Sequence, residues 1–350
     1  MSQEPSPATV GDPLPHLILP NSEGVGISLG HQNRAGRWQV LLFLDPADVP
    51  ARVEALLAAR ERLNGIEAYI YLIALSGPDA SLPGADMFDE SGKGAAFLLG
   101  MPNPGIAVIA PTGCLSAQLA ADDLDAAIMH CKAHASAFTN NVQKGTAPVL
   151  VMENLFEPEL CQRVVQYWQD NPKTTGGVAS SAHGNDQEIA SIKRRQDVVI
   201  PDGPLFEEIK GKIARRVLPQ IIRAYQMQIV SMEALRIGEY NASDAGAFGR
   251  HRDNATQFTA HRRLALTVNL NTGEYGGGEL RFPEFGPGLY QPPVGGGVVF
   301  SCGMLHEALP VNRGSRFGMF TFFTDAAGLE QEKQMHERMK AEQAAQQSQA

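Results

Sequence analysis

The chain from Ser231 to Asp325 is a series of short β-prone runs broken by clusters of glycine. Short strands joined by Gly/Pro turns are typical of antiparallel sheets, whereas the strands of parallel sheets are separated by helices. Two amphipathic helical segments, residues 157–168 and 204–225, precede the runs. The pattern predicts a double-stranded β-helix (jelly roll) with helices packed outside it. The five runs are EALRIGEY, RLALTVNLN, GELRFPEF, GGVVFS and RFGMFTFFTD.

The first 138 residues have a different pattern, in which apolar runs alternate with helical spacing. Residues 39–44, 68–75 and 106–109 suit strands covered on both faces. A helix is predicted to start at Asp48-Val49-Pro50 and to run through ARVEALLAARERL, and residues 122–134 predict a closing helix. Strands alternating with helices predict an α/β layer fold.

The two patterns predict two domains, as the length of 350 residues also favours. A polar stretch at 139–148 has no apolar periodicity and predicts a linker. We therefore expect an α/β domain at 1–138 and a jelly-roll domain at 149–326. Residues 327–350 are rich in Glu, Gln, Lys and Ala and predict a polar helical tail.

Composition narrows the class of partner. The formal net charge of -9 argues against nucleic-acid binding, which needs a basic face to displace counterions from phosphates. No stretch reaches the apolar length of a membrane span, and MSQEPSPATVGD lacks the basic and then apolar order of a signal peptide. The cysteines form no CxxC pair, so we expect a cytoplasmic protein with reduced thiols. They are Cys114, Cys131, Cys161 and Cys302.

His251-Arg252-Asp253, followed later by His306, is a candidate metal site. Two imidazoles and one carboxylate can occupy one face of a metal ion and leave the other face open, as in non-haem Fe(II) oxygenases. On a strand, His251 and Asp253 would point to the same side, because side chains alternate with period two. His306 would then come from a non-adjacent strand. The competing interpretation is a surface turn in which His251 only pairs with Asp253.

Arg316 lies a short way past His306 and shares one face of the last run with Gly318, Phe320 and Phe322. A guanidinium on an apolar inward face is costly unless a carboxylate meets it. Its planar fork can bind one end of a dicarboxylate through two parallel hydrogen bonds. The alternative is a structural salt bridge to a buried Asp or Glu.

The stretch from about 149 to 325 resembles the Fe(II)/2-oxoglutarate-dependent dioxygenases, particularly their prolyl 4-hydroxylase-like branch. The resemblance implies a hydroxylase that uses Fe(II), 2-oxoglutarate and O₂ on a C–H bond of an organic substrate and releases succinate and CO₂. Ascorbate is an optional further cofactor. Because Asp253 keeps an anionic ligand where halogenating relatives open a site for chloride, hydroxylation is the expected outcome. The matching segments are RIGEYNASDAGAFGRHRDN, LNTGEYGGGELRFPEFG and GGVVFSCGMLHEALPVNRGSRFGMFTFF.

The same resemblance implies roles for individual residues. His251, Asp253 and His306 would be the iron ligands and the catalytic centre, and Arg316 would hold the distal carboxylate of 2-oxoglutarate. Tyr240, Thr267 and Asn269 are candidates to face the cosubstrate. Collagen-modifying members have a lysine at the position of Arg316, so their substrate is not implied, and free amino acids, peptidyl residues and small molecules all stay open.

The segments GDPLPHLILPNSEGVGISL and GRWQVLLFLDPADVPARVEALL resemble the opening of peroxiredoxin-like proteins of the thioredoxin fold. In active peroxidases a cysteine thiolate follows the Pro-Ala-Asp run near a helix N-terminus, which lowers its pKa. Here Arg52 or a neighbour takes that position. We therefore expect a degenerate module that docks on the oxygenase, on the substrate or on a partner, including a second copy of the chain.

Two other functions compete with the oxygenase. A thiol-based peroxidase or redox sensor would use Cys114, and a non-catalytic scaffold would bind Fe or Zn without consuming 2-oxoglutarate. A basic cluster around the metal motif is interpreted as a solvated rim, and the alternative is that it attracts an anionic substrate or carrier. It consists of Arg250, Arg252, His261, Arg262 and Arg263.

Overall fold

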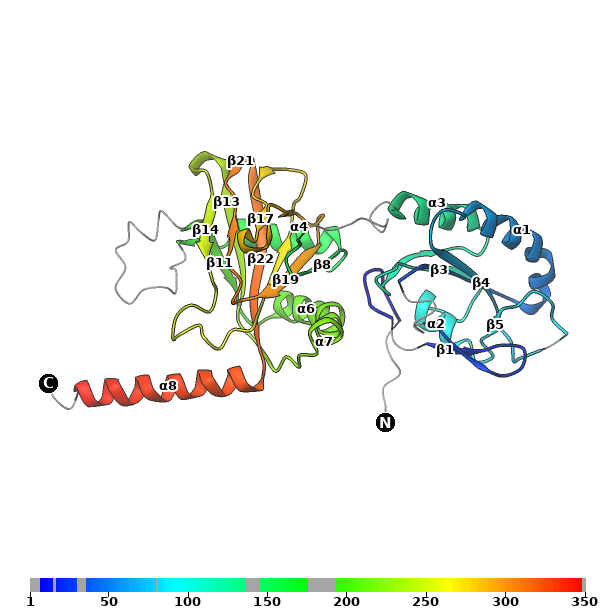
Figure 1. Ribbon diagram of the computed structural model, residues 1–350, viewed down its shortest axis with the longest axis horizontal. Helices are drawn as coiled ribbons and strands as arrows, with labels where there is room; N and C mark the ends of the chain where they lie inside the picture. The colour runs from blue at the N-terminus through cyan, green and yellow to red at the C-terminus, as the bar shows by residue number, and fades with distance from the viewer. Residues whose placement is uncertain are drawn as a thin grey trace. The chain divides into compact units, whose positions relative to one another are not determined.

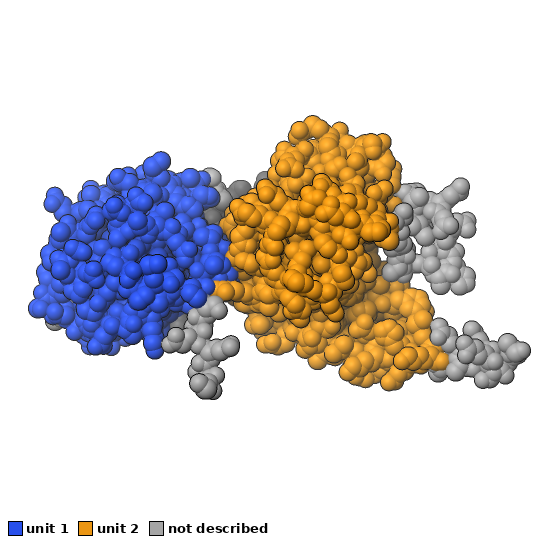
Figure 2. Space-filling view, turned by 180° about the vertical axis from the view of Figure 1, so that it is seen from behind, with its two compact units in different colours: residues 1–142 blue, residues 143–350 orange. Residues whose placement is uncertain are grey.

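The computed structural model describes residues 7–14, 17–29, 36–79, 81–135, 145–175 and 193–347. The chain divides into two compact units, residues 1–142 and 143–350 (Figure 2). Most of the expected linker at 139–148 lies outside the described residues. None of the described helices is both long enough and apolar enough to cross a membrane.

Unit 1 is built on a five-stranded mixed sheet in the order β5-β4-β3-β6-β7. Its central strand β3 runs parallel to β4 and antiparallel to β6, and all seven of its residues are buried. A strand buried on both faces needs a cover on each side, which explains its continuous apolar sequence. The strands are β3 (Trp38–Leu44), β4 (Ala68–Ala74), β5 (Met87–Phe88), β6 (Gly105–Ile109) and β7 (Leu115–Leu119).

Helices cover both faces of this sheet. On one face α1 (Val49–Arg62) and α3 (Leu124–His134) pack against alternate residues of β3. On the other face α2 (Lys93–Leu99) packs together with the two-stranded ribbon of β1 (Ile18–Pro20) and β2 (Gly26–Ser28). The expected α/β layers are therefore present in unit 1.

Unit 2 contains two antiparallel sheets and a short ribbon (Figure 1). The large sheet has the order β8-β19-β15-β22-β13-β11-β9, with β12 also pairing with β22, and the small sheet has the order β10-β14-β20-β17-β18. The large-sheet strands are β8 (Leu150–Met152), β9 (Thr174–Thr175), β11 (Gln196–Ile200), β12 (Ser231–Met232), β13 (Leu235–Asn241), β15 (Leu264–Asn269), β19 (Gly297–Ser301) and β22 (Ser315–Thr324). The others are β10 (Lys193–Arg194), β14 (Ala247–His251), β17 (Leu280–Arg281), β18 (Leu289–Tyr290) and β20 (His306–Ala308), with β16 (Gly276–Gly277) and β21 (Val311–Arg313) forming the ribbon.

The two faces of the large sheet carry different side chains. On β22, Phe317, Met319 and Phe323 pack against α4 (Pro158–Asp170), α6 (Pro204–Lys212) and α7 (Leu218–Tyr225). The intervening residues of β22 face the small sheet, and a second apolar cluster there joins residues of both sheets. The period-two alternation therefore separates a structural face from a face that lines an interior.

Two predicted elements differ in detail. GELRFPEF forms only β17 before a 3-10 turn at Pro283–Phe285, because proline cannot donate to a strand ladder. Residues 204–225 are helical throughout but include a π-helical turn, Ile213–Val217. Pro219, just beyond this turn, lacks the N–H that a regular α-helical hydrogen bond requires. This missing donor accounts for the local change from α-helical to π-helical hydrogen bonding. The polar tail is the helix α8 (Ala326–Gln347), which follows β22 (Figure 1).

Candidate functional site

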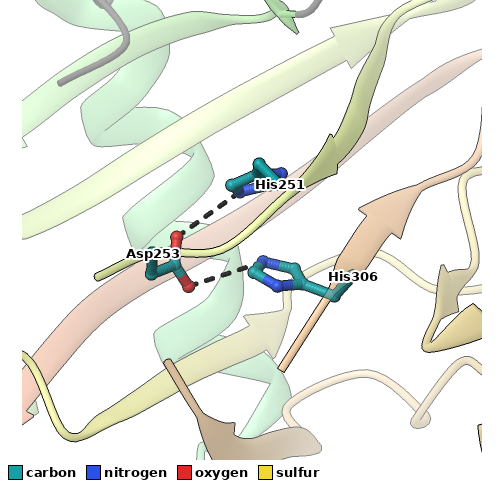
Figure 3. Close-up of side chains that lie close together, drawn as sticks. All are labelled: His251, Asp253 and His306. Carbon is teal, nitrogen blue, oxygen red and sulfur yellow. Dashed lines mark ion pairs between the residues drawn. The ribbon is translucent and has the colours of Figure 1, made fainter. Parts of the chain in front are cut away.

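Three side chains at the ends of two strands converge on one point (Figure 3). His251 is the last residue of β14, and His306 is the first residue of β20. One oxygen of Asp253 lies 3.4 Å from Nε2 of His251, and the other lies 3.4 Å from Nε2 of His306. All three ligand atoms lie within 4.8 Å of one another. This spacing fits donors that surround one ion at bonds of about 2 Å.

The backbone brings these residues together differently from the sequence-based expectation. β14 ends at His251, so Asp253 does not share a strand face with it, and that expectation was wrong. Asp253 sits in the following turn, where its N–H donates to the carbonyl of Cys302 at 3.0 Å. The expected non-adjacent strand was also wrong, because β14 and β20 pair directly and His251 lies opposite His306. A shift in register between Phe248 and His251 marks an irregularity that can re-aim a side chain.

Hydrogen bonds fix which nitrogen of each imidazole is available. Nδ1 of His251 lies 2.7 Å from the carbonyl of Gly249, and Nδ1 of His306 lies 3.0 Å from the carbonyl of Met304. A carbonyl can only accept, so Nδ1 carries the proton and the Nε2 lone pair points to the shared centre. Nε2 is therefore the nitrogen that each imidazole can offer to a metal ion.

Burial and neighbouring charges shift the pKa values of Asp253 and His306. Burial would raise the pKa of Asp253, but His306, His251 and Arg262 together hold it below its usual value. Burial is the main reason that the pKa of His306 is lowered. The site thus presents one carboxylate and a neutral imidazole, which are the forms that a divalent cation binds.

The convergent group opens into a pocket between the two sheets, lined by residues that the sequence pattern did not connect. Its walls are largely aromatic and aliphatic, with three guanidinium groups among them. The lining residues are Arg195, Arg236, Tyr240, Phe248, His251, Asp253, Ala265, Leu266, Thr267, Leu280, Phe300, His306, Ala308, Arg316, Phe320 and Phe322.

Arg316 lies in this pocket and is only 3% exposed. One terminal nitrogen donates to Oδ1 of Asn269 at 3.1 Å, and its Nε has no hydrogen-bond partner. Within the described parts of the chain, no Asp or Glu forms an ion pair with Arg316. The alternative of a structural salt bridge therefore has no support there. A buried guanidinium without a carboxylate partner is suited to bind an anionic ligand.

The other three cosubstrate candidates have different surroundings. Thr267 lines the pocket, and its buried Oγ1 has no hydrogen-bond partner. Tyr240 lies with its ring 5.1 Å from the guanidinium carbon of Arg316. Asn269 is not among the lining residues, since its amide nitrogen donates to the carbonyl of Pro292 at 3.0 Å while its oxygen holds Arg316. Asn269 is a positioning residue.

Sequence reasoning missed Arg195, which the structure places in the pocket wall. Arg195 binds Asp197 through two nitrogens, at 2.5 and 3.0 Å, and donates to the hydroxyl of Tyr240 at 3.1 Å. A Cβ on Gly238 would lie 2.5 Å from Cδ of Arg195, so this glycine makes room for the arginine. The close spacing of Lys193, Arg195 and Asp197 in the sequence was the signal that could have found it.

The basic cluster divides into exposed and buried members. Arg250 and Arg252 are exposed, as expected for a solvated rim, whereas His261 is only 7% exposed and lines a small pocket together with Phe323. Each arginine pairs with an acidic residue, which neutralises the cluster. The pairs are Arg250 with Glu307, Arg252 with Glu284, Arg262 with Glu233 and Arg263 with Asp325.

The thiols are placed for packing. Burial raises the pKa of both Cys131 and Cys161 to about 12, and it raises that of Cys302 well above its usual value. Cys114 is partly exposed in a turn, and none of the four cysteines, all of which lie in the described part of the chain, forms a disulfide. A thiol with so high a pKa is a poor nucleophile at neutral pH.

Comparison with known proteins shows what the part of the chain around this site is similar to. Residues 235–324 match the family model of the 2OG-Fe(II) oxygenase superfamily. Two PKHD-type hydroxylases, from Xanthomonas campestris pv. campestris (strain B100) and Shewanella frigidimarina (strain NCIMB 400), are 26% and 25% identical over 167 residues. Each alignment covers 44% of this chain and 66% of the relative, so the chain spans just under two thirds of those relatives.

Solved structures give matches of lower similarity. A Pseudomonas putida prolyl-4-hydroxylase has 18% identity and a TM-score of 0.41, covering 51% of this chain and 94% of that one. A Trichoplax adhaerens prolyl hydroxylase, in complex with a hypoxia-inducible factor peptide, has 16% identity and a TM-score of 0.43, covering 52% and 86%. The sequence comparisons thus agree with the expected similarity to the 2OG-Fe(II) oxygenases over residues 235–324.

Proposed function

We propose that this protein is a non-haem Fe(II)- and 2-oxoglutarate-dependent dioxygenase that hydroxylates a C–H bond of an amino-acid, peptidyl or small-molecule substrate. One observation carries the proposal: the buried Arg316 shares a pocket with the His251, Asp253 and His306 group and has no carboxylate partner in the described chain. A metal group alone would suit many reactions, but the added cation selects a dicarboxylate cosubstrate. Succinate and CO₂ are the expected co-products.

The residues present fit both absent groups. His251, Asp253 and His306 would hold Fe(II) through two Nε2 atoms and a carboxylate, which leaves one face of the ion open. Fe(II) and 2-oxoglutarate, when bound, supply O₂ activation and the oxidation of the C–H bond. The backbone carbonyls of Gly249 and Met304 keep the imidazoles oriented and in the correct tautomer.

Protein groups at the far end of the pocket would hold the cosubstrate. Arg316 would receive the distal carboxylate in its fork, and Asn269 fixes the plane of that fork. The unpartnered hydroxyl of Thr267 would donate to a ligand oxygen. The ring of Tyr240 would line the same end. The apolar wall, including Phe300 and Leu280, would exclude water from the reacting atoms.

Unit 1 would be a docking module. We assign it to the thioredoxin-like fold, as a degenerate peroxiredoxin-like domain at 1–138, joined by a 139–148 linker to a jelly-roll domain at 149–326. The order of its mixed sheet and the helices on both faces support this assignment. With Arg52 in the first turn of α1, it has no peroxidatic thiol there. Docking to a partner or to a second copy would be its role, in a cytoplasmic protein with free thiols.

The test is a two-step anaerobic titration of the full chain. Fe(II) and then 2-oxoglutarate are added, the visible charge-transfer absorption of the loaded complex is followed, and O₂ is admitted to measure succinate. We expect one Fe(II) and one 2-oxoglutarate per chain. Arg316→Ala should weaken 2-oxoglutarate binding by about 10- to 100-fold while Fe(II) still binds, as expected for loss of a charge-assisted bidentate contact. Arg313→Ala, an exposed arginine three residues away, is the control.

The competing functions give opposite results. A thiol-based redox protein would lose activity in Cys114→Ser and keep it in His251→Ala, whereas the oxygenase predicts the reverse. A non-catalytic metal scaffold would bind Fe(II) but would never convert 2-oxoglutarate to succinate with any substrate tested. Stoichiometric metal binding without succinate release would therefore refute the proposed activity.

A further inference from the structure

The pocket contains more positive charge than the proposed function uses. Three guanidinium groups line it, against a single carboxylate, Asp253, which belongs to the metal group. The proposed function assigns Arg316 to the cosubstrate, and Arg195 is held by Asp197 and Tyr240. Arg236 is the third guanidinium, and it has no role in the proposed function. In the described part of the chain no residue forms an ion pair or hydrogen bond with the side chain of Arg236, although it is only partly exposed.

Arg236 lines the same pocket as Arg316 but is offset from it along the paired strands β13 and β22. On β13, Arg236, Gly238 and Tyr240 share the pocket face, because side chains alternate. Tyr240 lies opposite Arg316 on β22, whereas Arg236 lies opposite Phe320. The offset of four residue positions corresponds to about 13 Å between Cα atoms along the strand. The two carboxyl carbons of a five-carbon dicarboxylate are only about 5 Å apart, judged from standard bond geometry, which is much less than this offset.

A stack of side chains connects the metal group to the region of Arg236. Phe248 stacks on the ring of His251 at 3.6 Å. The guanidinium carbon of Arg195 then lies 5.9 Å from the ring of Phe248 and 4.4 Å from that of Phe320. Because Asp197 and Tyr240 hold it, Arg195 is a fixed part of this wall. Arg236 is the adjacent cation that remains available to a ligand.

The charge around Arg236 is unbalanced. Lys193 and Arg195 both lie against the single carboxylate of Asp197, at 2.7 and 2.5 Å. Burial lowers the pKa of Lys193 to about 8, and the positive charges of Arg195 and Arg236 add to this effect. Lys193 and Arg195 therefore share one carboxylate, and Arg236 is a third cation close enough to affect Lys193. An anionic ligand would relieve the repulsion among them.

From this placement, and resting on the proposed function, we propose that Arg236 binds a carboxylate of the organic substrate. The substrate class is then a carboxylic acid, such as an amino acid or the C-terminal residue of a peptide, and not an internal peptidyl residue. One guanidinium matches the charge and the planar fork of one carboxylate, whereas a phosphate dianion calls for additional donors. The carboxylate at Arg236 would fix the distance from the anchor to the C–H bond presented at the metal group.

The test uses the full chain loaded anaerobically with Fe(II) and 2-oxoglutarate. The probes are matched pairs, each an N-acetyl amino acid and its N-methylamide, covering all twenty side chains. Binding is measured by calorimetry and succinate release after O₂ is admitted. At least one acid should bind 10-fold or more tightly than its amide and should stimulate succinate release. Arg236→Gln should abolish that preference, and Arg236→Lys should keep part of it because it retains the charge.

Arg194→Gln is the matched control, because it removes the same charge from an exposed position on β10, in the small sheet, and should leave the preference unchanged. Equal binding of acids and amides, no binding of any acid, or a preference that persists in Arg236→Gln would overturn the proposal. The charge-transfer absorption of the complex with Fe(II) and 2-oxoglutarate separates the proposed role of Arg236 from the proposed dioxygenase function. If this complex forms normally and no acid is preferred, only the role of Arg236 is refuted. A chain that never binds 2-oxoglutarate overturns both proposals.

Discussion

His251 and His306 lie directly opposite each other on the paired strands β14 and β20, with their ring centroids 4.2 Å apart. Cross-strand neighbours in an antiparallel pair are held at nearly constant separation by the ladder. The two imidazoles therefore keep their spacing as long as the strand pair is intact. Asp253 is the more adjustable member, since a turn carries it and one backbone hydrogen bond to Cys302 anchors that turn.

The first prediction concerns this carboxylate. Asp253→Asn keeps the shape of the side chain but removes the only negative charge in the metal group, so Fe(II) affinity should fall by at least about 100-fold. Equilibrium titration with Fe(II) under anaerobic conditions measures the loss, and circular dichroism checks the fold. Asp244→Asn, at an exposed position, should bind iron normally. Stoichiometric iron in Asp253→Asn would contradict the assignment of the ligands.

The second prediction concerns Asn269, which positions Arg316 without lining the pocket. Asn269→Ala should raise the KM for 2-oxoglutarate about 5- to 10-fold with little change in kcat, since one hydrogen bond to a charged group is lost. Asn269→Asp should raise the KM for 2-oxoglutarate further, because the new carboxylate would pair with Arg316 and compete with the cosubstrate. The exposed Asn312→Asp is the charge control. If Asn269→Asp binds 2-oxoglutarate as well as Asn269→Ala, the free charge on Arg316 is not what recruits the cosubstrate.

The third prediction tests the close approach at Gly238. A methyl group there would lie 2.5 Å from Cδ of Arg195, which must move and weaken its bonds to Asp197 and Tyr240. Gly238→Ala should therefore reduce the free energy of unfolding by about 1–3 kcal/mol, the range for overpacking. Urea unfolding of unit 2 measures this. Gly211→Ala is the matched control, since no atom lies within 4 Å of the added methyl in that helix. It should stabilise the protein by about 0.5–1 kcal/mol.

The fourth prediction is a dependence of stability on pH. Burial would raise the pKa of Glu157, but hydrogen bonds from Lys212, the backbone and Arg216 lower it to about 2. A depressed carboxyl pKa stabilises the folded state fully above its usual value of about 4.5, and the contribution is lost as the pH falls from there towards 2. Glu157 is 39% exposed, so solvent screening limits the effect to about 1 kcal/mol.

Glu157→Gln gives the measurement for this prediction. The variant should be less stable than the parent chain at pH 6, and the difference in urea midpoint should narrow progressively between pH 5 and pH 3. The exposed Glu207→Gln, which pairs only with Lys210 at 3.3 Å, should show almost no difference at either pH. If the difference in urea midpoint between Glu157→Gln and the parent chain stays constant over this pH range, Glu157 acts through packing and not through its charge.

Much of the site could be predicted because metal chemistry restricts residue types. Few residues can supply two imidazoles and a carboxylate, and an arginine on the apolar face of the last strand was informative for the same reason. Local patterns also predicted β3, β15, β19 and β22 close to their observed bounds, since their apolar period follows from which faces are covered. The alternation on β22 likewise placed Arg316 on the inner face.

The chain's own residue order thus determined most of its strands, the candidate metal ligands and the buried arginine that we propose binds a dicarboxylate. Only the tertiary structure decided that β14 pairs with β20, that a turn delivers Asp253, and that Arg195 and Arg236 enter the same pocket as Arg316. The physical reason is that strand pairing joins residues far apart in the sequence. Their contacts depend on register and on the sheet's closure, which a periodic pattern along one strand does not encode.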